Sequence, residues 1–178
     1  MGNEITTSQE FVYFGRGVNL RVDTVRLADG GVARREIVEH RDAVAVMPLD
    51  KDGNVLFVRQ FRKAVEQEMY ELPAGVMEDG ESPEEAARRE LAEETGLSAG
   101  SLQRLAGFYT TPGFSNEYIH IFAARDLQPA EATPDEDEDI TTDWIPLADA
   151  VGMIETGEVR DAKTIVGLLL VERKRRAQ

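Results

Sequence analysis

The sequence predicts an α/β fold in which a central mixed sheet carries helices on both faces and is preceded by an N-terminal β extension. Three observations indicate this class. Short apolar segments of strand length recur along the chain, a capped helical segment interrupts them, and two further helical segments lie near the C-terminus. With 178 residues, 42% of them hydrophobic, the chain is long enough for one domain with a sizeable core.

The N-terminal extension is predicted from two strand patterns and a turn. Residues 11–14 are apolar and aromatic, and residues 18–27 alternate apolar with polar side chains over much of their length. The Asp-Gly-Gly sequence at 29–31 is typical of a hairpin turn, so a return strand should follow it. We therefore assign residues 1–41 to the extension and residues 42–178 to the main domain.

The main domain contains further strand patterns and two helices near its end. The predicted strands cover residues 43–49, 55–61, 69–72, 102–110, 118–124 and 142–147. One helix is predicted at 149–156, ended by Gly157, and Asp161 caps a final helix whose apolar side chains recur at helical spacing. This order fits a mixed sheet covered by helices on both sides.

The best-defined element is a short helix predicted over residues 83–95. Ser82 is placed as the N-cap, Pro83 at the first helical position, and Glu85 as the acid that completes a capping box. Gly96 is a typical C-terminal stop. Nearly all residues between these ends are good helix formers, so both ends of the helix are specified locally.

This helix gathers three carboxylates. Glu90 and Glu94 lie four residues apart on one face, with Glu93 beside them. Like charges this close repel one another, and a hard divalent cation, which carboxylate oxygens bind well, is the expected compensation. Arg89 stands four residues before Glu93 and can hold that side chain in one rotamer.

The alternative is an acidic helix face that is merely solvated and carries local Glu–Arg pairs. The preceding loop favours the other interpretation. Residues 72–75, Leu-Pro-Ala-Gly, follow an apolar segment and can bring backbone carbonyls near the carboxylates. We therefore predict a metal site at this helix.

Residues 75–97 also carry a pattern with fixed spacing, G-x5-E-x7-R-E-U-x-E-E-x-G-U, in which U is apolar. Its positions are Gly75, Glu81, Arg89, Glu90, Leu91, Glu93, Glu94, Gly96 and Leu97. The chain resembles the Nudix hydrolases, which share this pattern. The resemblance implies a Nudix-type α/β/α sandwich and metal-dependent hydrolysis of a diphosphate bond.

Signals elsewhere in the chain resemble the ADP-ribose pyrophosphatase branch of that family. They are the Gln-Phe-Arg sequence at 60–62, the segment 71–75, the N-terminal extension, and Pro112 within segment 111–117. An ordinary Pro-Gly turn between two strands would also explain Pro112. The resemblance implies that ADP-ribose is cleaved to AMP and ribose 5-phosphate, and that the protein is a homodimer joined through its N-terminal strands.

The resemblance further implies the site residues by motif position. The metal ligands would be Ala74 (through its carbonyl), Glu90, Glu93, Glu94 and Glu138, for two or three ions of Mg²⁺ or Mn²⁺. The substrate contacts would be Arg35, Glu36, Arg62, Val76, Pro112, Gly113 and Glu117, with Arg35 and Glu36 supplied by the partner subunit. The catalytic group would be Glu136, Glu138, Glu93 and Arg89.

The acidic run at 135–139 supplies two of those residues. Five consecutive acids usually form a solvated loop. This run comes just before the strand predicted at 142–147, where a mobile loop could close and take the proton from an attacking water. By position Glu136 is the better candidate base and Glu138 the better extra ligand, although the order could be reversed.

Composition excludes several other classes. A formal net charge of −14 disfavours nucleic acid as a partner, because phosphate contacts need a basic surface. The absence of cysteine excludes disulfides, thiolate zinc sites and a cysteine nucleophile. The N-terminus lacks a signal-peptide pattern, and the apolar run at 165–171 is too short to cross a bilayer, so we expect a cytoplasmic protein without membrane contact.

Two other functions stay open. GDP-mannose or another nucleoside diphosphate sugar would suit the same metal site, which binds only the diphosphate. A non-catalytic sensor that binds ADP-ribose would belong to a different class. The intact Arg-Glu pair at 89–90 and Glu-Glu pair at 93–94 argue against the sensor.

Overall fold

The computed structural model describes residues 4–131 and 140–177, which form two compact units. The first unit runs to Asp42 and takes in Phe108–Tyr118, and the second comprises Ala43–Gly107 and the residues from Ile119 onward. The extension predicted at residues 1–41 lies in the first unit. Segment 108–118, which we had assigned to the main domain, belongs to the same unit.

The first unit is built on an antiparallel sheet of order β1-β2-β3. Its strands are β1 (Ile5–Phe14), β2 (Asn19–Arg26) and β3 (Val32–Glu39). Segment 108–118 joins this sheet, because the backbone N–H of Val38 donates to the carbonyl of Phe114 at 2.8 Å. β1 begins at Ile5, six residues before the predicted strand, and all ten of its residues are exposed. A strand without a buried face has no apolar alternation by which the sequence could reveal it.

The second unit contains two sheets among its described residues. A four-stranded sheet has the order β7-β4-β9-β8, and a three-stranded sheet has the order β10-β5-β6. The strands are β4 (Ala43–Pro48), β5 (Asn54–Arg62), β6 (Gln67–Glu71), β7 (Ala74–Val76), β8 (Leu97–Tyr109), β9 (Tyr118–Pro129) and β10 (Thr141–Pro146). The four-stranded sheet is mixed, as predicted, because β4 pairs parallel with β9 and antiparallel with β7.

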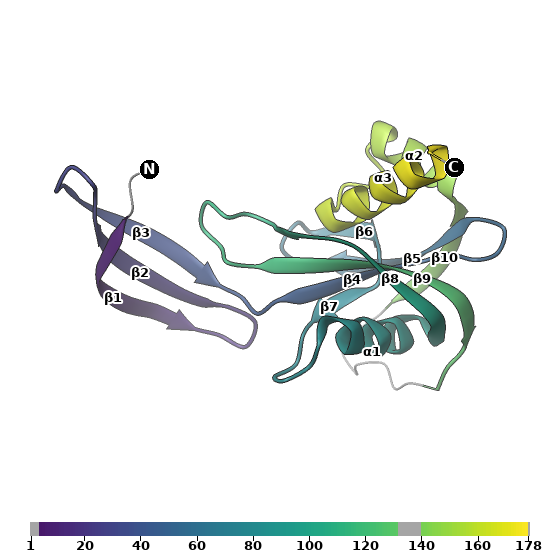
Figure 1. Ribbon diagram of the computed structural model, residues 1–178, viewed down its shortest axis with the longest axis horizontal. Coiled ribbons are helices and arrows are strands. Elements are labelled where there is room, and N and C mark those ends of the chain that lie inside the picture. The colour runs from purple at the N-terminus through teal and green to yellow at the C-terminus, as the bar shows by residue number, and fades with distance from the viewer. Residues whose placement is uncertain (1–3, 132–139, 178) are drawn as a thin grey trace. The chain divides into compact units, whose positions relative to one another are not determined.

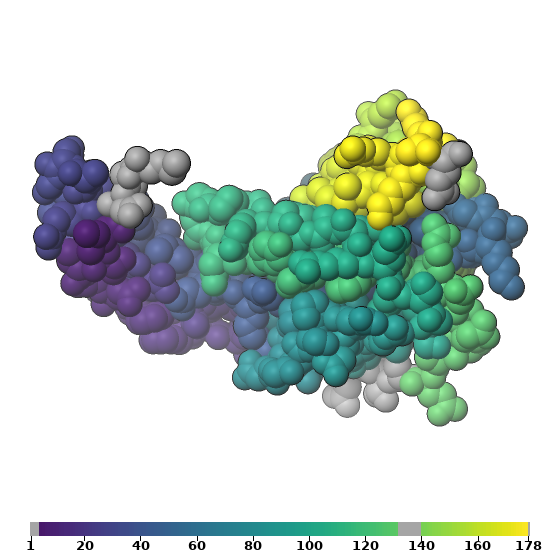
Figure 2. All heavy atoms as spheres, in the orientation of Figure 1, coloured from purple at the N-terminus to yellow at the C-terminus, as the bar shows by residue number. Residues whose placement is uncertain are grey.

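Helices cover both sides of these sheets. The helix α1 (Pro83–Thr95) lies on one side, and α2 (Leu147–Thr156) and α3 (Ala162–Arg176) lie together on the other (Figure 1). In the space-filling view the yellow atoms of α3 and the teal atoms of α1 likewise lie at opposite sides of this unit (Figure 2). In the part of the chain that the structure describes, none of the helices has the length and apolar character needed to cross a membrane.

Strand β4 is buried along its whole length because both of its faces are covered. Val44 and Val46 pack with Leu91 of α1 in one apolar cluster. Met47 packs with Leu168 of α3 in the other cluster. Successive side chains of a strand point to opposite faces, so this one strand holds the two layers of helices together.

The ends of α1 agree with the prediction over residues 83–95. The Ser82 hydroxyl accepts from the backbone N–H of Glu85 at 3.3 Å, and the Glu85 carboxylate accepts from the backbone N–H of Ser82 at 2.9 Å. Gly96 closes the helix in the left-handed region, with φ of 66°. By contrast α2 begins at Leu147, two residues before the predicted start, since the buried Leu147 belongs to the apolar core.

The N-terminus of α3 is tied to the segment that follows β6. Asp161 caps α3, as predicted, by accepting from the backbone N–H of Thr164 at 2.9 Å. The Thr164 hydroxyl, fully buried, accepts in turn from the backbone N–H of Leu72 at 2.9 Å. A single hydroxyl therefore satisfies a buried backbone donor 92 residues away in the chain.

We expect Thr164→Val to lower the free energy of unfolding by about 1–3 kcal/mol, because it keeps the side-chain shape but leaves the buried N–H of Leu72 without an acceptor. Urea denaturation of the purified variant measures this. The exposed Thr142 of β10 offers a matched control, and Thr142→Val should change stability by less than about 0.5 kcal/mol. Equal stabilities for the two variants would contradict the role assigned to the Thr164 hydroxyl.

Candidate active site

Two of the predicted metal ligands are buried carboxylates on the face of α1 that packs against β7. Glu90 and Glu94 are each 8% exposed. The carboxylate of Glu90 lies so close to Gly75 that a Cβ on this glycine would stand 2.1 Å from the carboxylate carbon. Only a residue without a Cβ leaves the Glu90 carboxylate in this position.

Strand β7 brings a third predicted ligand, Ala74, to the same place. The backbone N–H of Ala74 donates to the Glu94 carboxylate at 3.0 Å. Ala74 and Gly75 pair in turn with Ala45 and Val44 of β4. Sequence reasoning placed residues 72–75 in the loop before the helix, and the strand has only three residues, too few to show a period in the sequence.

Arg89 contacts three of the acids around this site. Its Nη1 atom donates to Glu90 at 2.7 Å and to Glu93 at 2.9 Å. Its Nε and Nη2 atoms both donate to the Glu81 carboxylate at 3.0 Å, and Nη2 also reaches the carbonyl of Val76 at 3.1 Å. Sequence reasoning paired Arg89 with Glu93 alone, and the structure adds Glu81 and Glu90 as partners.

These contacts shift the pKa values of both partners. The hydrogen bonds from Arg89 lower the pKa of the Glu81 carboxyl. The hydrogen bond to Glu81, together with those to Glu90 and Glu93, raises the pKa of Arg89 against the opposing effect of burial. Arg89 therefore stays charged and offsets part of the repulsion among the acids.

The donor chemistry of this cluster fits a hard divalent cation. Within residues 4–131 and 140–177, no three acidic or histidine side chains stand in position to bind one ion together. However, Glu90, Glu93 and Glu94 present carboxylate oxygens, and Arg89 Nη1 already lies between two of them as a positive group. The cradle at Gly75, which a Cβ would fill, keeps the Glu90 carboxylate beside the backbone of β7.

A second charged cluster joins Arg62, the last residue of β5, to Glu71, the last residue of β6. Arg62, a predicted phosphate contact, donates through Nε and Nη2 to the two oxygens of Glu71, at 2.7 and 2.8 Å. Lys163, in the first turn of α3, also binds the Glu71 carboxylate. Sequence reasoning missed Glu71 and Lys163 as functional candidates. The sequence offered one signal for Lys163. A cation in the first turn of a helix opposes the helix dipole, so a lysine at this position is unusual enough to examine.

The other predicted substrate contacts divide between the two units. Val76 lies in β7 of the second unit. The remaining five lie in the first unit and are Arg35, Glu36, Pro112, Gly113 and Glu117. Arg35 forms an ion pair with Glu4, and Glu117 accepts from the Thr110 hydroxyl at 2.6 Å. The predicted loop acids Glu136 and Glu138 lie outside the described residues.

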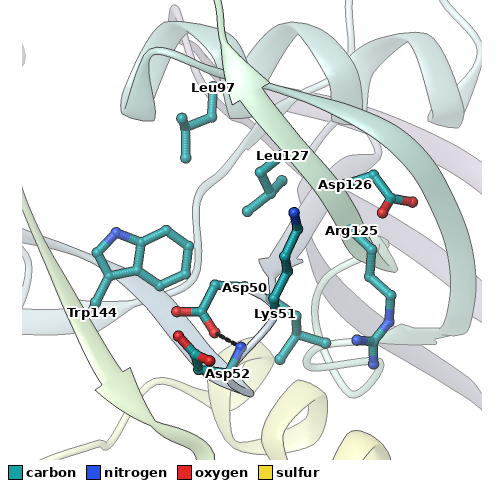
Figure 3. Close-up of a pocket in the computed structure, with 9 residues that line it drawn as sticks. Asp50, Lys51, Asp52, Leu97, Arg125, Asp126, Leu127 and Trp144 are labelled. Carbon is teal, nitrogen blue, oxygen red and sulfur yellow. Dashed lines mark hydrogen bonds between the residues drawn. The ribbon is translucent and has the colours of Figure 1, made fainter.

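A cavity of about 440 Å³ in the second unit contains none of the predicted site residues (Figure 3). It is lined by Leu49, Asp50, Lys51, Asp52, Leu97, Arg125, Asp126, Leu127 and Trp144. These residues lie around the turn between β4 and β5, at the end of β4 away from its pairing with β7. This cavity does not coincide with the acidic cluster, which is identified by its charges and by Gly75.

Comparisons with known proteins show which family the chain resembles. The NUDIX domain model matches residues 39–168. The chain is 41% identical over 177 residues to an ADP-ribose pyrophosphatase of Bacillus subtilis (strain 168), covering 98% of this chain and 96% of that protein. It is 36% identical over 160 residues to a GDP-mannose pyrophosphatase of Citrobacter koseri, covering 83% of each.

A solved structure extends the agreement to the fold. The crystal structure of an ADP compounds hydrolase matches with a TM-score of 0.90 and 26% identity, covering 98% of this chain and 95% of that one. The predicted α/β fold is thereby confirmed. The pattern at residues 75–97, the matching domain model and these relatives together show that the chain belongs to the Nudix family.

Proposed function

We propose that this Nudix pyrophosphohydrolase cleaves the diphosphate bond of a nucleoside diphosphate sugar, foremost ADP-ribose, to give AMP and ribose 5-phosphate. The observation that carries the proposal is the pair of buried carboxylates, Glu90 and Glu94, held against Gly75 and Ala74. Burying carboxylates costs free energy unless they are paired, and clustered buried acids are candidates for metal-binding or catalytic sites. The Bacillus subtilis relative, similar over nearly the whole chain, supports ADP-ribose as the substrate.

The chain's own residues have distinct parts in this reaction. Glu90 and Glu94, the carbonyl of Ala74, and Glu93 would hold Mg²⁺ or Mn²⁺ ions, two or three in number. When bound, these ions offset the charge of the diphosphate and lower the pKa of the water they hold. Arg89 fixes the carboxylates of Glu90 and Glu93 in place through its Nη1 atom.

Substrate binding and proton transfer fall to other residues. Arg62, with its side chain 41% exposed, would donate to the phosphate oxygens and offset the charge that builds up on them. Val76, Pro112, Gly113 and Glu117 would contact the nucleoside and ribose, and Arg35 and Glu36 would reach the substrate from the partner subunit. Glu136 or Glu138 would accept the proton of the attacking water, with Glu138 as a further metal ligand.

GDP-mannose is the second candidate substrate. The acidic cluster binds the diphosphate and not the base or the sugar, so it suits both compounds equally. The relative from Citrobacter koseri is the observation in favour of GDP-mannose. It covers less of the chain, at lower identity, than the ADP-ribose pyrophosphatase does.

We also propose that the protein is a homodimer joined through the N-terminal sheet. Large apolar side chains of β1 are exposed, among them Phe11, Val12, Tyr13 and Phe14, and Phe14 is 69% exposed. The rings of Phe11 and Phe14 stack with their centroids 5.0 Å apart. Exposed large apolar side chains that lie together, as Phe11 and Phe14 do, support a protein–protein interface here.

The substrate assignment predicts that ADP-ribose is hydrolysed faster than GDP-mannose, NADH, diadenosine polyphosphates and dNTPs, and that EDTA stops the reaction until Mg²⁺ is restored. Chromatographic product analysis of each reaction measures this, with Glu94→Gln as the variant expected to lose most activity at an unchanged fold. Faster cleavage of GDP-mannose would favour the second candidate. Tight binding of ADP-ribose without cleavage of any compound would indicate a sensor.

The position of Glu90 predicts a loss of activity without a comparable loss of stability in Gly75→Ala. The new Cβ would displace only the flexible end of Glu90, so the fold tolerates it, but the displaced carboxylate can no longer serve as a ligand. We expect kcat/KM to fall roughly 10- to 100-fold, the range for disturbed metal sites. Gly152→Ala, where nothing lies within 4 Å of the added Cβ, is the matched control and should keep full activity.

The dimer proposal predicts a mass in solution of twice the 19.8 kDa chain, measured by size-exclusion chromatography with light scattering. Replacing exposed apolar side chains removes the surface that holds the dimer, so the double variant Phe11→Ser, Phe14→Ser should shift the mass toward that of the monomer. A wild-type protein with the monomer mass at all concentrations would refute the proposal.

A further inference from the structure

The ion pairs around Glu71 are more elaborate than the fold requires. The Glu71 side chain is only 3% exposed, yet it accepts from two cations. Arg62 binds it in a bidentate manner, and Lys163, 11% exposed, binds one of the same oxygens. Burying several charges carries a large desolvation penalty, and well-packed apolar residues often stabilise a fold equally well.

The position of Lys163 adds to this cost. Lys163 stands two residues after the N-cap Asp161, in the first turn of α3, where a positive charge opposes the helix dipole. The Asp161 carboxylate lies 3.1 Å from Lys163 Nζ, but its other oxygen is occupied by the backbone N–H of Thr164. An acid at position 163 would interact more favourably with the helix dipole than the lysine does.

Arg62 is the member of this group that can reach a ligand. Its Nε and Nη2 atoms are fixed by Glu71, whereas Nη1 donates to no described residue. Its side chain is 41% exposed, far more than that of Glu71 or Lys163. The hydrogen bond to Glu71 raises the pKa of Arg62 against the effect of burial, and the charge of Glu94 acts in the same direction. The field of the acidic cluster on α1 thus extends to this guanidinium.

We propose that Glu71 and Lys163 are positioning residues, which act through Arg62 to present a fixed positive group to the substrate diphosphate. Glu71 locks one edge of the guanidinium and leaves the other edge toward the ligand. Lys163 offsets the charge of Glu71, so that an approaching phosphate meets the positive charge of Arg62 with less opposition from the carboxylate behind it. The inference rests on the proposed hydrolysis and assigns α3 a part in it.

Two physical effects follow from this arrangement. A free arginine loses rotamer entropy when it is immobilised, and holding Arg62 beforehand removes part of that cost from substrate binding. Without Lys163, the ion pair of Arg62 with Glu71 would be neutral overall and would attract an anion weakly. Because the protein has a net charge of −14, binding of an anionic substrate depends strongly on such local positive charge.

A double-mutant cycle on Lys163 and Arg62, with ADP-ribose and Mg²⁺, tests the proposal. We expect Lys163→Met to raise KM roughly 5- to 20-fold, with a smaller change in kcat, and the same substitution in an Arg62→Ala background to change KM less than about twofold. Lys163→Arg should restore most of the affinity. An equal fold-effect of Lys163→Met in both backgrounds would overturn the proposal, because a purely structural role does not act through Arg62.

Two additional measurements separate this inference from other failures. Glu71→Gln keeps the size of the side chain and should show the same dependence on Arg62, which covers the case in which Lys163→Met does not fold. The Nε–Hε resonance of Arg62, identified by its loss in Arg62→Ala, should be protected in the wild type and broadened in Lys163→Met. An unchanged resonance in Lys163→Met would reject the positioning role, whether or not the protein hydrolyses any of the substrates. Absence of hydrolysis alone would reject only the proposed function.

Discussion

The approach of the Glu90 carboxylate to Gly75 is the contact on which the rest of the site depends. It is possible only because residue 75 has no Cβ, and it lets the acidic face of α1 lie directly against β7. From that position Glu94 reaches the backbone N–H of Ala74, and Arg89 reaches the carbonyl of Val76. One small residue therefore determines how closely three carboxylates and a strand can be assembled.

The short segment 71–76 is held from both sides of the sheet layer. The backbone N–H of Leu72 donates to Thr164 of α3, and the backbone N–H of Ala74 donates to Glu94 of α1. Between them the carbonyl of Pro73 accepts from the backbone N–H of Val46 at 2.8 Å. Helices on opposite faces thus fix two residues of one segment, Leu72 and Ala74, with Pro73 bound to β4 between them. A displacement of either helix would therefore disturb the acidic cluster.

The sequence predicts those features that are specified locally. The helix 83–95 is correct at both ends because Ser82, Glu85 and Gly96 form its caps within a few residues of one another. Strand β1 was predicted too short because its polar, exposed residues show no alternation, and β7 is too short to show any. The contact between Glu71 and Lys163 joins residues 92 apart, and no local pattern specifies such a pairing.

The two arginines of the site differ in the donors that they keep available, and this difference separates their roles. Arg89 uses Nε, Nη1 and Nη2 on Glu81, Glu90, Glu93 and the carbonyl of Val76. All three of its guanidinium nitrogens donate to groups within the protein, so we infer that Arg89 holds these acids together. Arg62 donates through two nitrogens to the carboxylate of Glu71, which Lys163 also binds. Its third nitrogen, Nη1, donates to no residue that the structure describes. In this strongly acidic protein, the proposed role of Arg62 complements that of the metal ions, because both place positive charge beside the anionic substrate.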